Sequence, residues 1–193
     1  MQVFLPQGLN AKGGSVKIKI DFSFIAPFEG SDRMGVLETK NGKIFTIAQW
    51  YPRMCVYDDV RGWNTNPYLG ASEFYLEYGE FDVSITAPAN HIVVASGELL
   101  NPSVVYSTVE QSRLAQAKQS DKTVFIRTAA EVENSSKIVS ATTKTWNYKI
   151  KNARDFSWSS SAAFILDAAK INLPSGKKSL AVSVYTVESA GDA

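Results

Sequence analysis

The sequence predicts a mainly β protein: an antiparallel β-sandwich or saddle-like sheet domain with one short surface helix near residues 109–119. Three observations predict this fold class. Several segments alternate apolar and polar side chains, as half-buried antiparallel strands do. Gly, Pro and Asn residues separate these segments at short intervals, which is typical of turns between strands. Residues 110–119 are good helix formers. We expect the whole chain, residues 1–193, to form a single β domain.

The clearest alternation in the chain lies at residues 16–24. Its apolar residues fall on one face: Val16, Ile18, Ile20, Phe22 and Phe24. Its polar residues fall on the other: Lys17, Lys19, Asp21 and Ser23. A period of two predicts a half-buried antiparallel strand here.

The next element is a predicted hairpin. Asn41-Gly42 is a tight-turn signal, and residues 36–39 and 43–47 on either side read as its two strands. The second strand leads into residues 49–64, which hold two of the four Trp and follow neither strand nor helix periodicity. We expect a long loop at one end of the sandwich. Such loops often carry function, and the alternative is a structural loop that covers the open end of the sandwich.

The rest of the chain predicts further strands and the helix. The strands are expected at residues 80–87, 92–95, 123–128, 143–150, 163–166 and 180–185. In residues 80–87 and 143–150 the inward side chains are expected to be Phe81, Val83, Ile85, Ala87, Trp146, Tyr148 and Ile150. Thr108 is expected to cap the helix, with Gln111 at the capping-box position.

Composition excludes several function classes. The net charge of +1 and the pI near 7.7 give no electrostatic case for binding nucleic acid or an anionic membrane surface. No apolar run is long enough to span a bilayer. One cysteine, Cys55, and one histidine, His91, cannot supply the usual ligands of zinc, so we expect no metal and no cofactor in this chain. We expect Cys55 to be buried and His91 to have a structural role at the start of a strand.

Residue patterns also predict no catalytic residues. Asp58 and Asp59 are adjacent, so in extended chain they point to opposite sides and are poorly placed to flank one bond. A surface ion-pair cluster with Arg53 and Arg61 is the better interpretation. Motifs for a nucleophile elbow, a phosphate-binding loop or a His-Glu-x-x-His zinc site are absent from the sequence. The residues alone therefore favour a binding or scaffold domain.

Several segments nevertheless resemble one known family. They are FTIAQWYPRM at 45–54, YDDVRGWN at 57–64, EFYLEYG at 73–79, FDVSITAP at 81–88, ASGELLN at 95–101 and NARDFSW at 152–158. In this order they resemble the amino-terminal, saddle-like β domain of aminopeptidase N-like zinc metallopeptidases, or gluzincins, of the bacterial branch.

The resemblance implies a domain that packs on a thermolysin-like catalytic domain and helps to wall the substrate cleft. Zinc would then belong to the catalytic domain of the parent, which follows this domain in the family and is absent from this chain. Family members also have strands ahead of the equivalent of Val3. We therefore expect this chain to be a fragment of the peptidase's amino-terminal domain.

The resemblance also implies two substrate-binding residues, Gln49 and Tyr51. Many members read Thr-Gln-x-Gln or Thr-Gln-x-Glu before the Pro, and the second polar residue binds the free amino group of the substrate. Tyr51 occupies that place here, and a phenol lacks the negative charge that an ammonium group prefers. The expected activity of the parent is therefore aminopeptidase-like hydrolysis of a peptide substrate, and both a strict and a less strict requirement for a free amino terminus stay open.

Two further expectations concern partners. The alternative function class is a free-standing extracellular binding module, for instance for carbohydrate, with Trp50, Tyr51 and Trp63 as a stacking platform. We also expect the isolated chain to self-associate, as a two-fold dimer through an edge strand at residues 3–5 or 16–24 or through the face left bare by the missing catalytic domain.

Overall fold

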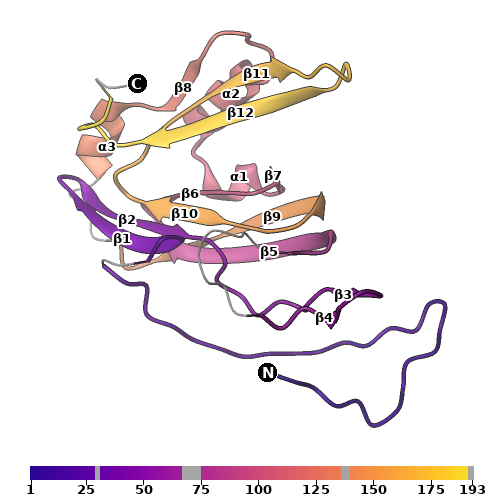
Figure 1. Ribbon diagram of the computed structural model, residues 1–193. Coiled ribbons are helices and arrows are strands. Elements are labelled where there is room, and N and C mark those ends of the chain that lie inside the picture. Colours follow the sequence, from indigo (N-terminus) through magenta and orange to yellow (C-terminus); the bar gives the residue numbers. More distant parts are fainter. Residues whose placement is uncertain (29–30, 67–74, 136–139, 191–193) are drawn as a thin grey trace.

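The computed structural model describes residues 1–28, 31–66, 75–135 and 140–190. Within these ranges the chain is mainly β, with several antiparallel sheets and three short helices (Figure 1). The predicted fold class, an antiparallel β-sandwich-like domain, is confirmed. None of the described helices is long and apolar enough to cross a membrane.

The predicted hairpin is present and forms one side of a four-stranded sheet. Strand β1 (Met34–Thr39) pairs with β2 (Gly42–Ile47), and Thr39 lies opposite Gly42. The sheet has the order β1-β2-β10-β6, where β10 spans Trp158–Ser161 and β6 spans Ile92–Ala95.

A second sheet contains the long strands predicted around residues 80–87 and 143–150. Its order is β5-β9-β7, with β5 at Gly79–Pro88, β9 at Thr143–Ala153 and β7 at Glu98–Leu99. The predicted inward residues face one another across the sheet, in the pairs Phe81–Ile150, Val83–Tyr148 and Ile85–Trp146.

The third sheet has the order β12-β11-β8, and a separate hairpin stands apart from all three sheets. Strand β8 spans Val124–Arg127, β11 spans Ile165–Asn172 and β12 spans Lys178–Tyr185. The separate hairpin pairs β3 (Tyr57–Asp58) with β4 (Gly62–Trp63), within the predicted 49–64 loop.

The helices differ in detail from the prediction. The predicted helix is α2 (Thr108–Ala117), but Ser107 caps it and Glu110 completes the capping box. The shift arises because the Ser107 hydroxyl accepts the Glu110 N–H while the Glu110 carboxylate accepts the Ser107 N–H, which makes Thr108 the first helical residue. Two further short helices, α1 (Pro102–Val105) and α3 (Ala129–Ser135), were not predicted.

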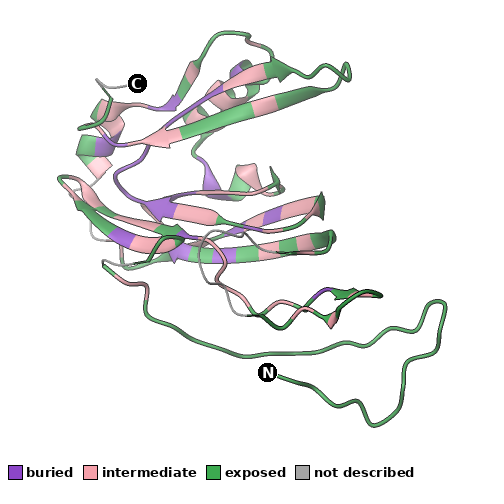
Figure 2. Ribbon diagram, viewed as in Figure 1, coloured by how far each residue is buried: buried purple, intermediate pink, exposed green. Residues whose placement is uncertain are grey.

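The core lies between the sheets, where buried residues gather in β5, β9, β10 and β11 (Figure 2). Its largest fully buried side chains include Trp146, Phe156, Ile126 and Leu166. Gly97 marks a close approach of backbones near this core, because a Cβ there would lie 2.4 Å from the Lys149 carbonyl oxygen of β9.

The strand predicted at residues 16–24 is wrong. This stretch is extended but belongs to no sheet, and it runs below the sheets as part of an exposed N-terminal arm, residues 1–28 (Figures 1 and 2). The same holds for residues 3–5. Alternation reports that a segment has two unlike faces, whereas a strand also needs a neighbour that accepts and donates its backbone hydrogen bonds.

Candidate functional site

The first part of the predicted loop, residues 49–56, is fixed by one carboxylate. Asp155 lies in the link between β9 and β10. Tyr51 donates its hydroxyl hydrogen to Asp155 Oδ1 at 3.2 Å, and Arg53 Nη2 donates to Asp155 Oδ2 at 3.0 Å. The N–H of Phe156 donates to the same Oδ1 at 2.7 Å. Each carboxylate oxygen therefore holds the loop against the β9–β10 link.

Aromatic rings pack around this anchor edge to face. The Trp50 ring meets the Tyr51 ring at 5.3 Å and 72°, and the Trp158 ring at 6.5 Å and 86°. Tyr51 in turn packs on Phe81 of β5 at 5.8 Å and 71°. Trp50 Nε1 donates to the carbonyl oxygen of Phe156 at 3.2 Å. Trp50 and Tyr51 are thus partly buried and inclined to each other, so they do not form one flat stacking surface.

Tyr51 is a neutral phenol in this setting. Burial raises the pKa of Tyr51 to about 12, and the negative charge of Asp155 adds to the shift. The Arg53 guanidinium lies 5.1 Å from the centre of the Tyr51 ring, which is cation–π distance. The hydroxyl hydrogen is already used by Asp155, so what Tyr51 offers a ligand is ring surface and the remaining lone pair of its oxygen.

Gln49, the other predicted substrate-binding residue, has an unusual backbone. Its φ of 54° lies in the left-handed region, which residues other than glycine rarely adopt. The turn is held on one side by the Ala48 N–H, which donates to the Arg33 carbonyl oxygen at 3.0 Å, and on the other by the Tyr51–Asp155 contact. Such outliers cluster at functional sites, which makes Gln49 a candidate for a functional residue.

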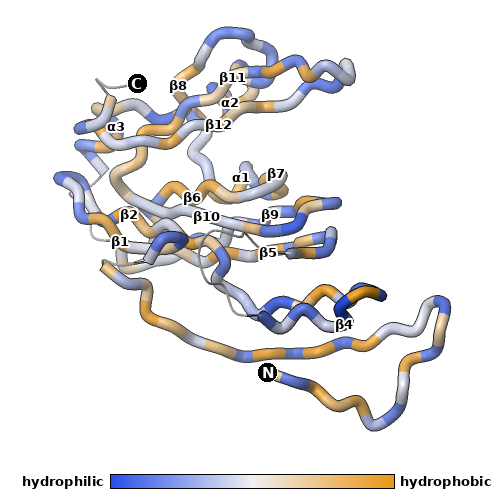
Figure 3. Tube along the Cα trace, in the orientation of Figure 1, coloured by the Kyte–Doolittle hydropathy of each residue, from blue (hydrophilic) through white to orange (hydrophobic). Residues whose placement is uncertain are grey.

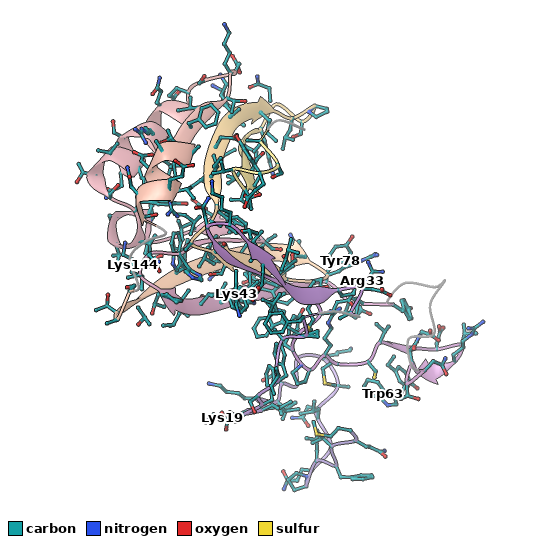
Figure 4. The ribbon with its side chains drawn as sticks, turned by 90° about the vertical axis from the view of Figure 1, so that its left-hand side faces the viewer. Lys19, Arg33, Lys43, Trp63, Tyr78 and Lys144 are labelled. Carbon is teal, nitrogen blue, oxygen red and sulfur yellow. The ribbon has the colours of Figure 1, made fainter. Side chains whose placement is uncertain are left out.

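The second part of the predicted loop is the exposed hairpin of β3 and β4. Tyr57 and Trp63 pack edge to face at 5.2 Å and are 62% and 56% exposed. Met54 and Val60 beside them in sequence are 70% and 85% exposed. Trp63 lies on this hairpin away from the sheets (Figure 4). Trp63 therefore pairs with Tyr57, and the three-ring platform with Trp50 and Tyr51 is not assembled.

The predicted ion-pair cluster around Asp58 and Asp59 is wrong. Arg53 pairs with Asp155 instead. Asp58 Oδ1 accepts the backbone N–H groups of Val60 at 3.0 Å and Arg61 at 2.7 Å, which makes it a turn residue of the hairpin.

The prediction that Cys55 is buried is also wrong. Its side chain is exposed, while the next residue, Val56, is 2% exposed. Successive side chains of extended chain point to opposite sides, so only one of these neighbours can face the protein interior.

His91 lies just before β6, at the start of a strand as predicted. Its Nδ1 lies 2.9 Å from the Ser160 hydroxyl oxygen. Burial lowers the pKa of His91, and the positive charge of Arg127 lowers it further, so the ring is neutral at pH 7. Because Ser160 is only 3% exposed, this pair is poorly placed to act as a nucleophile and its base.

Within the described ranges, no three His, Cys, Asp or Glu side chains are grouped so that they could hold a metal ion. Two residues of the resemblance segment at 73–79, Glu73 and Phe74, lie outside the described residues. Comparison with family models, with curated proteins and with solved structures found no significant match.

Sequence reasoning missed Asp155 and paired Arg53 with the wrong partners. A signal for Asp155 existed, because it lies in the resemblance segment at 152–158. Nothing in the local pattern, however, links residues about a hundred positions apart in the chain.

Proposed function

We propose that this chain is a non-catalytic amino-terminal domain of a zinc metallopeptidase. It packs on the catalytic domain of its parent protein and helps to wall the cleft in which peptides are hydrolysed. Zinc and the catalytic residues belong to that other domain.

One observation carries the proposal. Three of the segments that resemble the peptidase family, 45–54, 81–88 and 152–158, meet at a single cluster of contacts around Tyr51 and Asp155. These segments are far apart in sequence. Their convergence supports the proposal, because segments that serve one shared site are expected to lie together in space.

In the proposed role, Gln49 and Tyr51 lie beside the N-terminal end of the bound peptide. The carboxylate that Tyr51 contacts is already paired with Arg53 at 3.0 Å. A substrate ammonium group beside this loop would therefore meet the neutral phenol of Tyr51. The negative charge of Asp155 behind it is already neutralised by Arg53. This favours a parent peptidase that does not require a free amino terminus.

The proposal is tested on the complete gene product, with the present chain as the control. We expect the complete protein to hold stoichiometric zinc and to hydrolyse fluorogenic peptides with free and with blocked amino termini, both in a chelator-sensitive way. The present chain should show neither zinc nor turnover. A complete protein without zinc and without peptide hydrolysis would contradict the proposal, as would zinc-dependent turnover by the present chain alone.

A second candidate, a free-standing binding module, is favoured by the exposed Tyr57–Trp63 pair. Exposed aromatic faces bind sugar rings by stacking. The discriminating measurement is a titration of the present chain with a panel of oligosaccharides, followed by intrinsic Trp fluorescence. Saturable binding that Trp63→Ala abolishes, together with a complete protein lacking hydrolysis, would favour the module over the peptidase domain.

A further inference from the structure

The N-terminal arm contains an extended stretch whose backbone pairs with no other described segment. Among the described residues, no backbone hydrogen bond joins residues 15–26 to any other segment. The arm is nevertheless rich in apolar side chains (Figure 3). Five of them, at positions 16, 18, 20, 22 and 24, are 40–49% exposed.

The side chains of this stretch are already sorted as in a β-strand. On the outer face, Lys19 Nζ lies 3.3 Å from Asp21 Oδ2, and both side chains are 83% exposed. Figure 4 shows Lys19 at the outside of the molecule. On the inner face, the rings of Phe22 and Phe24 stack at 6.4 Å and 9°, and Phe22 contacts Trp50 at 6.2 Å. The stretch therefore has the two unlike faces of a strand, with Phe22 against Trp50, but it makes no backbone hydrogen bond to another described segment.

We propose that residues 16–24 pair with the same residues of a second copy of this chain, as an antiparallel ribbon with its two-fold axis at Ile20. In this register Lys19 of each copy lies opposite Asp21 of the other. Ile18 lies opposite Phe22, Val16 opposite Phe24 and Lys17 opposite Ser23. Opposite charges and apolar pairs directly across a ribbon stabilise it.

The charged side chains favour this register over the adjacent registers. Moving the axis by one residue to Lys19 or to Asp21 sets two like charges directly opposite each other at the centre. If one strand instead shifts by one residue relative to the other, the axis falls between two residues. Apolar side chains then lie opposite polar or charged ones on the same face. In a parallel in-register pair, each of Lys17, Lys19 and Asp21 lies beside the same residue of the other chain, so like charges are neighbours.

The inner face explains why such a ribbon can persist. An isolated two-stranded ribbon is marginal in water, because it has no third layer to cover its apolar face. Here Phe22 of that face already packs on Trp50, and a groove adjoins it that is lined by Ile20, Asp21, Phe22, Ser23, Phe24, Trp50 and Trp158. Pairing then adds interchain hydrogen bonds to a surface that is already partly supported.

A charge swap tests the register. In Lys19→Asp, both copies present acidic side chains at positions 19 and 21; in Asp21→Lys, both present basic ones. We expect each variant alone to raise the dimer dissociation constant by roughly tenfold or more, since two attractive pairs become repulsive. An equimolar mixture of the two variants restores both opposite-charge pairs and should form the heterodimer.

Sedimentation velocity over a micromolar concentration series measures this. Lys12→Asp and Asp32→Lys are the matched controls, because both positions are exposed and lie outside the ribbon; they should leave the dimer unchanged. A wild-type chain that stays monomeric at high micromolar concentration overturns the proposal and leaves a strand of another protein as the arm's partner. The proposal is also overturned if neither charge variant changes the dimer dissociation constant, or if the equimolar mixture stays monomeric.

A cross-link tests the two-fold axis. In a Cys55→Ser background, Ile20→Cys should form a disulfide with its own copy under mild oxidation, because directly opposite antiparallel residues have Cα atoms within disulfide range. Leu9→Cys, also exposed but outside the ribbon, is the control. Equal cross-linking of both variants, or none at position 20, would contradict the proposed axis.

Discussion

The hydroxyl group of Tyr51 donates a hydrogen bond to Asp155 Oδ1 at 3.2 Å, across 104 residues of sequence. The other oxygen of that carboxylate pairs with Arg53, and the side chains involved are only partly exposed, at 16% for Arg53 and 32% for Asp155. The loop that carries the two predicted substrate-binding residues is therefore held by one side chain from the β9–β10 link.

The first prediction concerns this anchor. Asp155→Asn removes the charge that faces Arg53 but keeps an oxygen for Tyr51 and Phe156. We expect the free energy of unfolding to fall by about 1–3 kcal/mol, because hydrogen bonds to charged groups in partly buried places contribute that much. Urea unfolding measures it. The matched control is Asp82→Asn, since Asp82 is 69% exposed and 3.7 Å from Lys149; it should change stability by less than about 0.5 kcal/mol. Equal effects of the two variants would show that Asp155 is not an anchor.

The second prediction concerns the pH dependence of stability that arises from His91, the only histidine in the sequence. The pKa of His91 is lowered in the folded protein from its ordinary 6.5, first by burial and then by Arg127. The unfolded chain therefore binds a proton at higher pH than the folded chain does. Stability should be full above about pH 6.5 and should decline as pH falls through the lowered folded pKa.

Urea unfolding between pH 7.5 and pH 5.5 checks this, with His91→Gln as the control. The variant should show a smaller decline over the same interval, because the imidazole is gone. NMR titration of the single imidazole gives the folded pKa directly. A folded pKa above that of the unfolded chain would reverse the expected slope and refute the prediction.

The third prediction concerns Cys55. Its side chain is exposed, so a thiol reagent should label the native protein stoichiometrically without denaturant. Val56→Cys in a Cys55→Ser background is the buried counterpart and should label only after unfolding. Labelling of Cys55 that requires denaturant would mean that the side chains at 55 and 56 face the other way.

The fourth prediction separates the hydroxyl of Tyr51 from its ring. Tyr51→Phe keeps the packing on Trp50 and Phe81 and loses the hydrogen bond to Asp155, so unfolding free energy should fall by about 0.5–1.5 kcal/mol. The same substitution at Tyr57, whose ring is 62% exposed, is the control and should have little effect on thermal stability. A loss no greater than the control's would mean that the hydroxyl adds nothing to the folded state.

Much of the fold could be predicted because its signals are local. The hairpin of β1 and β2 follows from Asn41-Gly42, and β5 and β9 follow from strict alternation of long segments. Helix α3 also had a local signal that was overlooked: the Thr128 hydroxyl and the Glu131 carboxylate form a capping box, which the spacing of these two residues encodes.

The N-terminal arm and the contacts of Asp155 were harder to predict from the sequence, and for the same physical reason. Alternation at residues 16–24 cannot say whether a neighbouring strand is available. Likewise, Arg53 had acidic residues close in sequence, yet it pairs with Asp155 on another element. Side chains choose partners by proximity in space, and only the assembled sheets place Asp155 within reach.

We propose that the 49–56 loop walls the substrate cleft of a peptidase, and Tyr51→Ala in the complete protein tests this role most directly. The measurement is steady-state hydrolysis of peptides that differ at the N-terminal residue, alongside the melting temperature. If the loop has this role, KM or the preference among these peptides should change more than thermal stability does, with zinc content unchanged. A large loss of thermal stability with unchanged kinetics would contradict it and would show that Tyr51 only holds the loop.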